Sequence, residues 1–277
     1  MRGKRYALFF SALAAFLVAG VSPAAAEPLS NTARYIDNVS NLLLAAALPI
    51  TLLVEGILAY VVWKFRKTEE AKPTKENRRL EITWTVATAV VLLFVGVAAY
   101  GAMAQPSVTA TQTTYQNAVD DGAVQVDIIG VQWYWKAEYP EHNISYTANM
   151  QDKPIVVPAE RQLAIMTTAT DVIHAVHIPA LKLKKDSIPG QKNYIVTTIN
   201  SEAIRDDPYV LYCAEFCGAG HSNMLAGFKV VSQQEYQNWV EQQTSSGSGS
   251  GASSGSSGTA NNSSASVAAP SAGQLAA

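Results

Sequence analysis

Two long apolar segments near the beginning of the chain restrict its possible folds more than any other feature. They run from about residue 42 to 63 and from about residue 82 to 103. Each is close to the roughly 20 residues that an α-helix needs to cross the hydrocarbon core of a bilayer. The first contains one charged side chain, Glu55, which must be protonated or face another protein at that depth. The sequence therefore predicts two transmembrane helices.

Basic residues between these two segments set the predicted orientation. The connector 64–79 contains seven lysine or arginine residues and three acidic ones, whereas residues 27–41 contain one basic residue, Arg34. Cytoplasmic loops of membrane proteins carry an excess of lysine and arginine. We therefore expect a helical hairpin over residues 27–106 in a bacterial inner membrane, with both of its outer ends facing the periplasm.

The first 26 residues have the pattern of a secretory signal peptide. Three basic residues lie among the first five, an apolar run follows, and small residues occupy positions 23–26. An uncleaved membrane anchor is the alternative, but the small-residue ending favours cleavage before Glu27. We leave residues 1–26 out of the fold prediction.

Residues 107–243 have a different pattern, in which short β-rich runs are separated by Pro and Gly. The runs are 124–131, 155–157, 163–170, 194–199, 209–213 and 225–231. Short strands at such intervals are typical of a β-sandwich or barrel. A capping box over residues 232–235 predicts a short helix that closes this domain.

The predicted β domain is acidic, with nine basic and fifteen acidic side chains. Over the whole chain the numbers are 20 and 22, which excludes a nucleic-acid-binding protein that relies on overall basicity. A net negative domain favours a basic partner through electrostatic steering, although the same charge also favours solubility.

The C-terminal segment, residues 244–277, contains no charged and no aromatic side chain. A segment dominated by Ser, Gly, Ala and Asn cannot bury enough apolar surface to offset its ordering entropy. We therefore predict a disordered tail. The tail contains no CxxCH motif for haem attachment.

The strongest chemical signal is the segment 213–224, CAEFCGAGHSNM. It holds two thiols, one imidazole and one thioether: Cys213, Cys217, His221 and Met224. Sulfur donors combined with imidazole favour copper, zinc or iron–sulfur sites, and the thioether favours copper. Gly218 and Gly220 allow the chain to curl around one point. A disulfide between the cysteines is the alternative in an oxidising compartment, but the neighbouring imidazole and thioether argue against it.

A further ligand must come from elsewhere in the chain. His174 and His177 are both available, and on an extended strand they point to opposite faces. Residue pattern alone leaves the choice between them open. His142 lies in a polar, turn-like segment and is a weaker candidate.

Four stretches together resemble subunit 2 of the haem–copper cytochrome c oxidases. They are QWYW (132–135), DVIH (171–174), KKDSIPG (184–190) and CAEFCGAGHSNM (213–224). The resemblance covers roughly residues 35–243. It implies a membrane α-helical hairpin joined to an all-β, cupredoxin-like Greek-key barrel that holds a binuclear copper centre, CuA. It also implies an oxidoreductase and proton translocase in which the chain works with subunits 1 and 3, and in which haem is bound by subunit 1.

The resemblance also implies a set of copper ligands. They are His174, Cys213, Glu215, Cys217, His221 and Met224. The cysteines would bridge both copper ions, each histidine would bind one ion, and the methionine and the backbone carbonyl of Glu215 would complete the shell. This pattern selects His174 over His177. The carboxylate of Glu215 is implied to bind a Mg²⁺ or Mn²⁺ ion shared with subunit 1, and carboxylates suit such hard ions.

Four other residues acquire roles from the resemblance. Trp133 would be the point at which electrons arrive from cytochrome c, and Glu138 and Asp171 match acidic positions of the surface that docks this donor. Glu81, at the cytoplasmic start of the second span, matches a glutamate at the mouth of a proton path into subunit 1. An acid that only stabilises the helix start is the alternative for Glu81. The sequence departs from the family at Val131, where a histidine is common.

The sequence thus predicts the copper-containing subunit of a respiratory cytochrome c oxidase. It would receive electrons from cytochrome c and pass them to haem in subunit 1, where oxygen reduction is coupled to proton pumping. The alternatives are a copper-free quinol oxidase subunit with a structural role, a separate CuA enzyme such as a nitrous oxide reductase, and a copper-delivery protein. The intact ligand set argues against the first, and residues 244–277 cannot supply the catalytic domain that the second requires.

Overall fold

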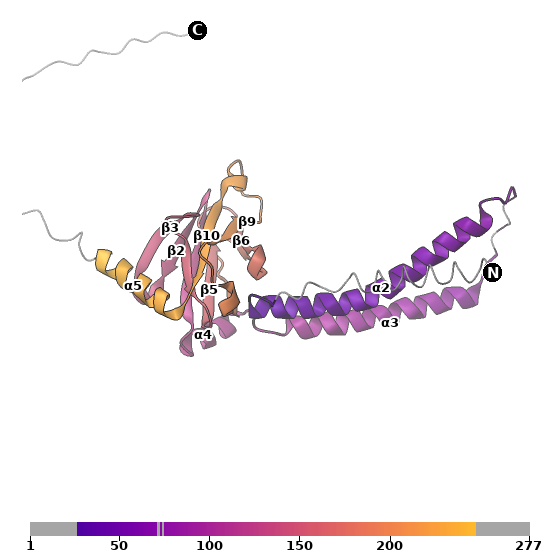
Figure 1. Ribbon diagram of the computed structural model, residues 1–277, viewed down its shortest axis with the longest axis horizontal. Helices are drawn as coiled ribbons and strands as arrows, with labels where there is room; N and C mark the ends of the chain where they lie inside the picture. Colours follow the sequence, from indigo (N-terminus) through magenta and orange to yellow (C-terminus); the bar gives the residue numbers. More distant parts are fainter. Residues whose placement is uncertain (1–26, 71–72, 74, 248–277) are drawn as a thin grey trace, which may run out of the picture.

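The structure, a computed structural model, describes residues 27–70, 73 and 75–247. The predicted signal peptide, residues 1–26, lies outside the described residues, as does most of the predicted tail. A long helical hairpin extends from one end of a β domain (Figure 1). The β domain is therefore displaced along the hairpin axis and does not cover the sides of the helices.

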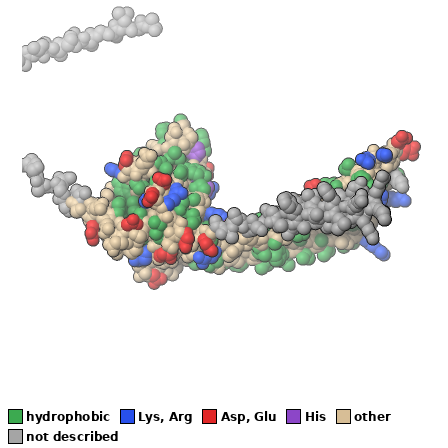
Figure 2. Space-filling model, viewed as in Figure 1, with side chains coloured by type: hydrophobic (Ala, Val, Ile, Leu, Met, Phe, Trp, Pro, Cys, Tyr) green, Lys and Arg blue, Asp and Glu red, His purple; other side chains and the backbone are tan. Residues whose placement is uncertain are grey.

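The hairpin consists of α2 (Asn31–Phe65) and α3 (Arg78–Met103), which lie side by side (Figure 1). Both helices are long and apolar enough to cross a membrane, which confirms the predicted pair of spans. Helix α2 begins eleven residues before the predicted span and bends near its middle, where Pro49 interrupts the hydrogen-bond ladder. Hydrophobic side chains cover much of the visible hairpin surface, and charged ones gather at its far end (Figure 2).

The β domain contains two five-stranded sheets. In the first sheet the strand order is β3 (Ile144–Ala148), β2 (Tyr134–Tyr139), β1 (Val124–Val131), β5 (Gln162–Ala169) and β8 (Asn193–Thr198). In the second it is β4 (Ile155–Pro158), β10 (Leu225–Val231), β9 (Tyr209–Cys213), β6 (His174–Ile178) and β7 (Leu183–Ser187). The pairs β1–β5 and β4–β10 are parallel, and the other neighbours are antiparallel.

The strands confirm the predicted cupredoxin-like all-β fold. All six β-rich runs form strands, and β2, β3, β6 and β7 are additional to them. Side chains of β1 alternate between buried and half-buried, as expected for a strand with one face on the core. The core between the sheets includes Ile128, Trp135, Leu163, Leu211 and Phe228, all fully buried.

Two shorter helices and four 3₁₀ turns complete the β domain. The helices are α4 (Gln112–Asp120) and α5 (Gln233–Gly247). The turns are η1 (Pro140–His142), η2 (Pro179–Leu181), η3 (Ser201–Ala203) and η4 (His221–Asn223). Helix α4 was not predicted, and it is held at its start by a reciprocal pair of hydrogen bonds between Thr111 and Thr114.

Helix α5 begins with the predicted capping box. The Ser232 hydroxyl donates to a Glu235 carboxylate oxygen at 2.8 Å and accepts from the Glu235 N–H at 3.3 Å. The helix continues to Gly247, into the segment predicted as a tail. Trp239 and Val240 pack the preceding turn against the core, and the Thr244 hydroxyl donates back to the Val240 carbonyl at 3.0 Å.

The start of α2 is fastened directly to the β domain. Ser30 is fully buried and its hydroxyl donates to the Leu181 carbonyl at 2.8 Å. The Thr32 hydroxyl lies 2.7 Å from the Ser107 carbonyl and 3.0 Å from the Thr197 hydroxyl. These buried polar contacts hold the hairpin and the β domain in one relative orientation.

Candidate metal centre

Strand pairing brings two distant parts of the chain together at one end of the second sheet. His174 is the first residue of β6, and Cys213 is the last residue of β9. These strands run antiparallel, with Val176 opposite Cys213. The remaining sulfur and imidazole donors lie in the loop 214–224, between β9 and β10. The loop therefore curls back over the end of β6.

The two thiols lie at the centre of this cluster. The Sγ atoms of Cys213 and Cys217 are 3.8 Å apart, far beyond the roughly 2.05 Å of a disulfide, and both cysteines are free. Cys213 Sγ lies 3.7 Å from His174 Nδ1 and 3.1 Å from the Glu215 carbonyl oxygen. Cys217 Sγ lies 3.6 Å from Nδ1 of the second histidine, His221. Each sulfur therefore has one imidazole beside it.

The thioether of Met224 closes the cluster, with its Sδ 3.8 Å from Cys217 Sγ. Met224 and His174 are fully buried, and both cysteines are 3% exposed. Burial and the adjacent Cys213 thiol raise the pKa of Cys217 to about 11. Metal-binding cysteines are thiolates, and a cation would offset the cost of forming them here. A donor set of two thiols, two imidazoles, one thioether and one carbonyl oxygen fits copper.

Two glycines allow the ligand loop to take this shape. Gly218 has a φ of +112°, in the region that favours glycine. At Gly220 a Cβ atom would lie 2.4 Å from the ring of Trp133. A side chain at position 220 would therefore displace this ring. The prediction that the glycines permit the curl is consistent with both observations.

The aromatic block 132–135 contributes to both the core and the site. Trp135 is buried, while Trp133 is 42% exposed and reaches the ligand loop. Trp133 Nε1–H donates to the Cys217 carbonyl at 3.0 Å, and the Gln132 side-chain amide donates to the same oxygen at 2.7 Å. The indole thus extends from solvent to the backbone of a proposed ligand. Gln132 was not predicted as a site residue, and its position next to Trp133 was the only signal for it.

Asp171 is turned toward the cluster. Its Oδ1 lies 2.9 Å from His174 Nε2, and its Oδ2 accepts from the Gln132 backbone N–H at 2.7 Å. Burial alone would raise the pKa of Asp171, but the bonds from Gln132, His174 and Val172 outweigh it and lower that pKa. With Nε2 engaged, His174 presents Nδ1 to Cys213. Asp171 was predicted only as a docking residue, although its spacing of three residues from His174 was a signal for this contact.

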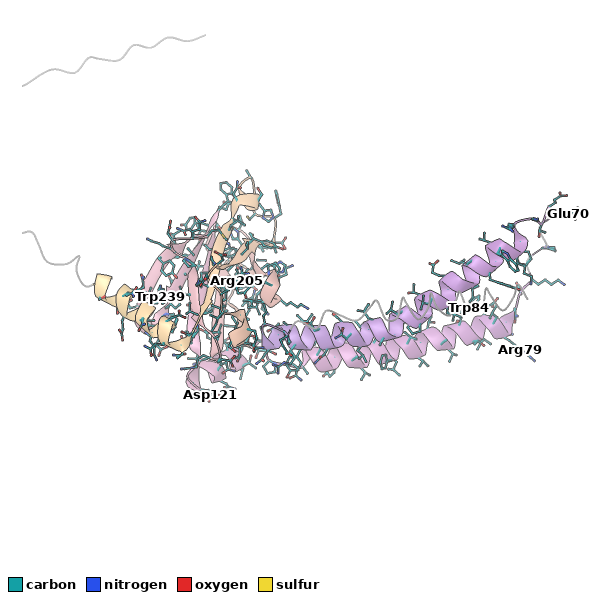
Figure 3. All side chains as sticks on the ribbon, in the orientation of Figure 1. Glu70, Arg79, Trp84, Asp121, Arg205 and Trp239 are labelled. Atoms are coloured by element: carbon teal, nitrogen blue, oxygen red, sulfur yellow. The ribbon has the colours of Figure 1, made fainter. Side chains whose placement is uncertain are left out.

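The other predicted site residues lie apart from the thiols. The Glu138 carboxylate pairs with Lys136 at 2.5 Å on β2. The Glu215 side chain is exposed, although its carbonyl faces Cys213. Glu81 is in the first turn of α3. Figure 3 places the nearby Arg79 at the end of the hairpin away from the β domain.

The two remaining histidines contact tyrosines. The ring centroids of His177 and Tyr212 are 4.9 Å apart, and those of His142 and Tyr236 are 6.3 Å apart. Burial, together with nearby Lys184, lowers the pKa of His177. Of the two candidates that residue pattern left open, His174 is the one beside the thiols.

Comparisons with known proteins agree with one another. Residues 124–231 match the family described as cytochrome c oxidase subunit II, periplasmic domain, and residues 20–101 match its transmembrane domain. Cytochrome c oxidase subunit 2 of Cereibacter sphaeroides is 28% identical over 258 residues, which cover 80% of this chain and 79% of that protein. The Arabidopsis thaliana subunit 2 is 28% identical over 217 residues, covering 70% and 78%.

Among solved structures, one similar chain is the periplasmic domain of subunit II of cytochrome oxidase (CoxB) of Bradyrhizobium japonicum. It has 28% identity and a TM-score of 0.41, and the match covers 44% of this chain and 94% of that one. Together with the two apolar helices, the family matches and the similar subunit 2 sequences describe a membrane protein that carries a soluble domain.

Proposed function

Since the chain belongs to the cytochrome c oxidase subunit 2 family, we propose that it is the electron-receiving subunit of a respiratory oxidase. It would take electrons from cytochrome c and pass them to haem in subunit 1, where oxygen is reduced and protons are pumped. One observation carries this proposal: two buried free thiols lie 3.8 Å apart, each beside an imidazole nitrogen. The chain would assemble with subunit 1 and subunit 3.

The proposed copper ligands are the donors of the cluster. They are His174, Cys213, the Glu215 carbonyl, Cys217, His221 and Met224. Copper held by these residues would supply one-electron chemistry without bond making or breaking in a substrate. The protein contributes a buried, preorganised cage, because strand pairing and two glycine positions hold the donors together.

Trp133 is the proposed point at which electrons reach the cage. Its indole is partly exposed and bonded to the Cys217 carbonyl, so one residue joins the protein surface to a ligand backbone. The exposed carboxylates of the acidic domain would steer a basic cytochrome c toward this face. Glu138 is a weaker contributor, since Lys136 partly neutralises its charge.

Glu215 would contribute a ligand to each of two metal sites. Its carbonyl faces Cys213 while its carboxylate is exposed. A Mg²⁺ or Mn²⁺ ion held by that carboxylate at the boundary with subunit 1 would lie next to the copper cage. Carboxylate and water ligands suit such ions.

The direct test is metal analysis and optical spectroscopy of the copper-loaded full chain. The full chain is needed because Ser30 and Thr32, at the start of α2, are buried against the β domain. We expect two copper ions per chain and a near-infrared band. A chain that binds no copper would favour the quinol oxidase alternative, and one labile ion removed by a mild chelator would favour copper delivery.

We predict that Asp171→Ala weakens copper binding by about 10- to 100-fold, the usual cost of losing a group that orients a histidine ligand. Glu138→Ala is the matched control. Glu138 is another carboxylate of the predicted docking surface, but it pairs with Lys136 and not with a proposed copper ligand. Competition titration with a copper chelator measures both affinities. Equal copper affinities in the two variants would leave Asp171 with a docking role alone.

We predict that Glu81→Ala slows turnover of the assembled oxidase several-fold and leaves the copper spectrum unchanged. Glu81 is exposed at the hairpin end remote from the metal cluster, where the proposed proton path begins. Glu76→Ala removes an exposed acid just before the same helix and serves as the control. If Glu81→Ala turns over at the normal rate, Glu81 has no role in a proton path and only stabilises the start of the helix.

A further inference from the structure

Gly130, next to last in β1, is a glycine that the backbone conformation does not require. Of the glycines in the described part of the chain, Gly122, Gly190 and Gly218 have the positive φ that favours this residue, and Gly130 does not. Gly130 is also buried. Glycine weakens the interior of a strand and often marks a place where another group approaches closely. The reason for a glycine at position 130 is therefore space.

The group that occupies this space is the imidazole of His174. A Cβ atom at position 130 would lie 2.7 Å from Cδ2, 2.9 Å from Cγ and 3.1 Å from Cβ of His174. Carbon atoms that are not bonded to each other pack best at about 3.5–4.0 Å, so an alanine at position 130 would push against the ring. Gly130 belongs to the first sheet and His174 to the second. The contact therefore joins the two sheets across the core.

The ring of His174 has little room to move away from such an alanine. It is fully buried, and the ring of Trp135, which pairs with Gly130 across the strands, lies with its centroid 6.0 Å from the imidazole centroid. On its edge, Nε2 lies 2.9 Å from Asp171 Oδ1 and Nδ1 lies 3.7 Å from Cys213 Sγ. A displaced ring would therefore change its distance to Asp171, to Cys213 or to both.

We propose that Gly130 is a positioning residue of the copper site, because its missing side chain leaves the space in which the His174 ring reaches Cys213. This inference rests on the proposed copper ligands. None of those ligands lies in the first sheet, since His174 and Cys213 belong to the second sheet and the others to the loop 214–224. The first sheet would thus contribute to the copper site through a residue that has no donor atom in its side chain.

The first test compares Gly130→Ala with Gly227→Ala in the copper-loaded full chain. Gly227 is a buried glycine of β10 with a similarly crowded environment. A Cβ atom there would lie 2.7 Å from the Met150 carbonyl oxygen and 3.0 Å from the Cβ atoms of Pro154 and Pro208, none of which is a proposed ligand. We expect Gly130→Ala to weaken copper affinity by about 10- to 100-fold and to shift the near-infrared band. Gly227→Ala should keep both at the values of the unsubstituted chain. Chelator competition and optical spectroscopy measure them.

The second test needs no copper. In the copper-free full chain, we expect Gly130→Ala to lower the midpoint of thermal unfolding by about 5 °C, as overpacking of a core does. The same change in a His174→Ala chain meets no ring and should lower the midpoint by less than half as much. Gly227→Ala should lower the midpoint equally with and without the His174 ring. If Gly130→Ala alone does not fold, recovery of folding in the His174→Ala chain supports the same contact.

The outcomes separate this inference from the proposed function. If the unsubstituted chain binds no copper, the proposed function is wrong. If that chain binds copper and Gly130→Ala binds it with the same affinity and spectrum, only the role of Gly130 is wrong. Equal losses of copper affinity in Gly130→Ala and Gly227→Ala would assign the effect to general destabilisation and overturn the proposal. Equal losses of thermal stability with and without the His174 ring would also overturn it.

Discussion

Replacing Cys217 with serine is expected to abolish the paired-copper spectrum. Cys217 Sγ lies within 3.8 Å of three other donors of the cluster: Cys213 Sγ, His221 Nδ1 and Met224 Sδ. A serine hydroxyl is a harder and far less acidic donor, and cannot replace a thiolate ligand. We expect copper content to fall from two ions per chain to one or none. Electron paramagnetic resonance and metal analysis measure both changes.

The same variant should almost stop oxidation of cytochrome c by the assembled oxidase, with a loss above about 100-fold, since loss of a group that only supports a ligand already costs about 10- to 100-fold. Ala219→Ser is the matched control, because it adds a hydroxyl to the same loop at an exposed position and removes no donor. Both variants should keep the thermal stability of the copper-free chain. Retention of two copper ions by Cys217→Ser would contradict the proposed ligand set.

Replacing Trp133 with alanine is expected to leave two copper ions in place and to slow oxidation of cytochrome c by at least about tenfold. Trp133 supplies no metal donor, but its Nε1–H bonds to the Cys217 carbonyl and its ring packs on Gly220. Loss of the indole breaks the contact from the surface to the ligand loop, and small displacements of a positioned group can cost about 100-fold in rate. Stopped-flow kinetics with reduced cytochrome c measures the effect.

Tyr134→Ala is the control for this prediction. Tyr134 is adjacent and 40% exposed, close to the 42% of Trp133, but it makes no hydrogen bond to the ligand loop. It should oxidise cytochrome c at nearly the normal rate. Trp133→Phe, which keeps a ring and loses the hydrogen bond, should lie between the two. If Trp133→Ala transfers electrons normally, the electrons arrive by another surface residue.

Features that depend on local sequence could be predicted well. The two spans follow from uninterrupted apolar runs, and six of the ten strands follow from β-rich segments bounded by Gly and Pro. The capping box of α5 also depends only on neighbouring residues, Ser232 and Glu235. Helix α4 was missed because its stabilising pair consists of two threonines, a weaker signal than a glutamate or glutamine at the same position.

Features that depend on contacts between distant segments could not be predicted from pattern. The resemblance assigned the Asp171 carboxylate to a docking surface, and no pattern predicted that it also bonds His174 and the Gln132 backbone, which is 39 positions away in the chain. The contact between Ser30, just before α2, and the Leu181 carbonyl likewise requires the hairpin and the β domain to meet. Both arrangements depend on how strands and helices pack, which residue spacing does not specify.

The chain by itself determined the kind of site, because Cys213, Cys217, His221 and Met224 lie in one short loop whose donors favour copper. It left the partner histidine open, and only resemblance to a family selected His174. The tertiary structure placed His174 beside Cys213 because β6 pairs with β9, and turned its Nδ1 inward because Asp171 holds the other ring nitrogen. The amino-acid sequence determines which donor atoms are available. Strand pairing determines where they come together, because backbone hydrogen bonds decide which distant residues become neighbours.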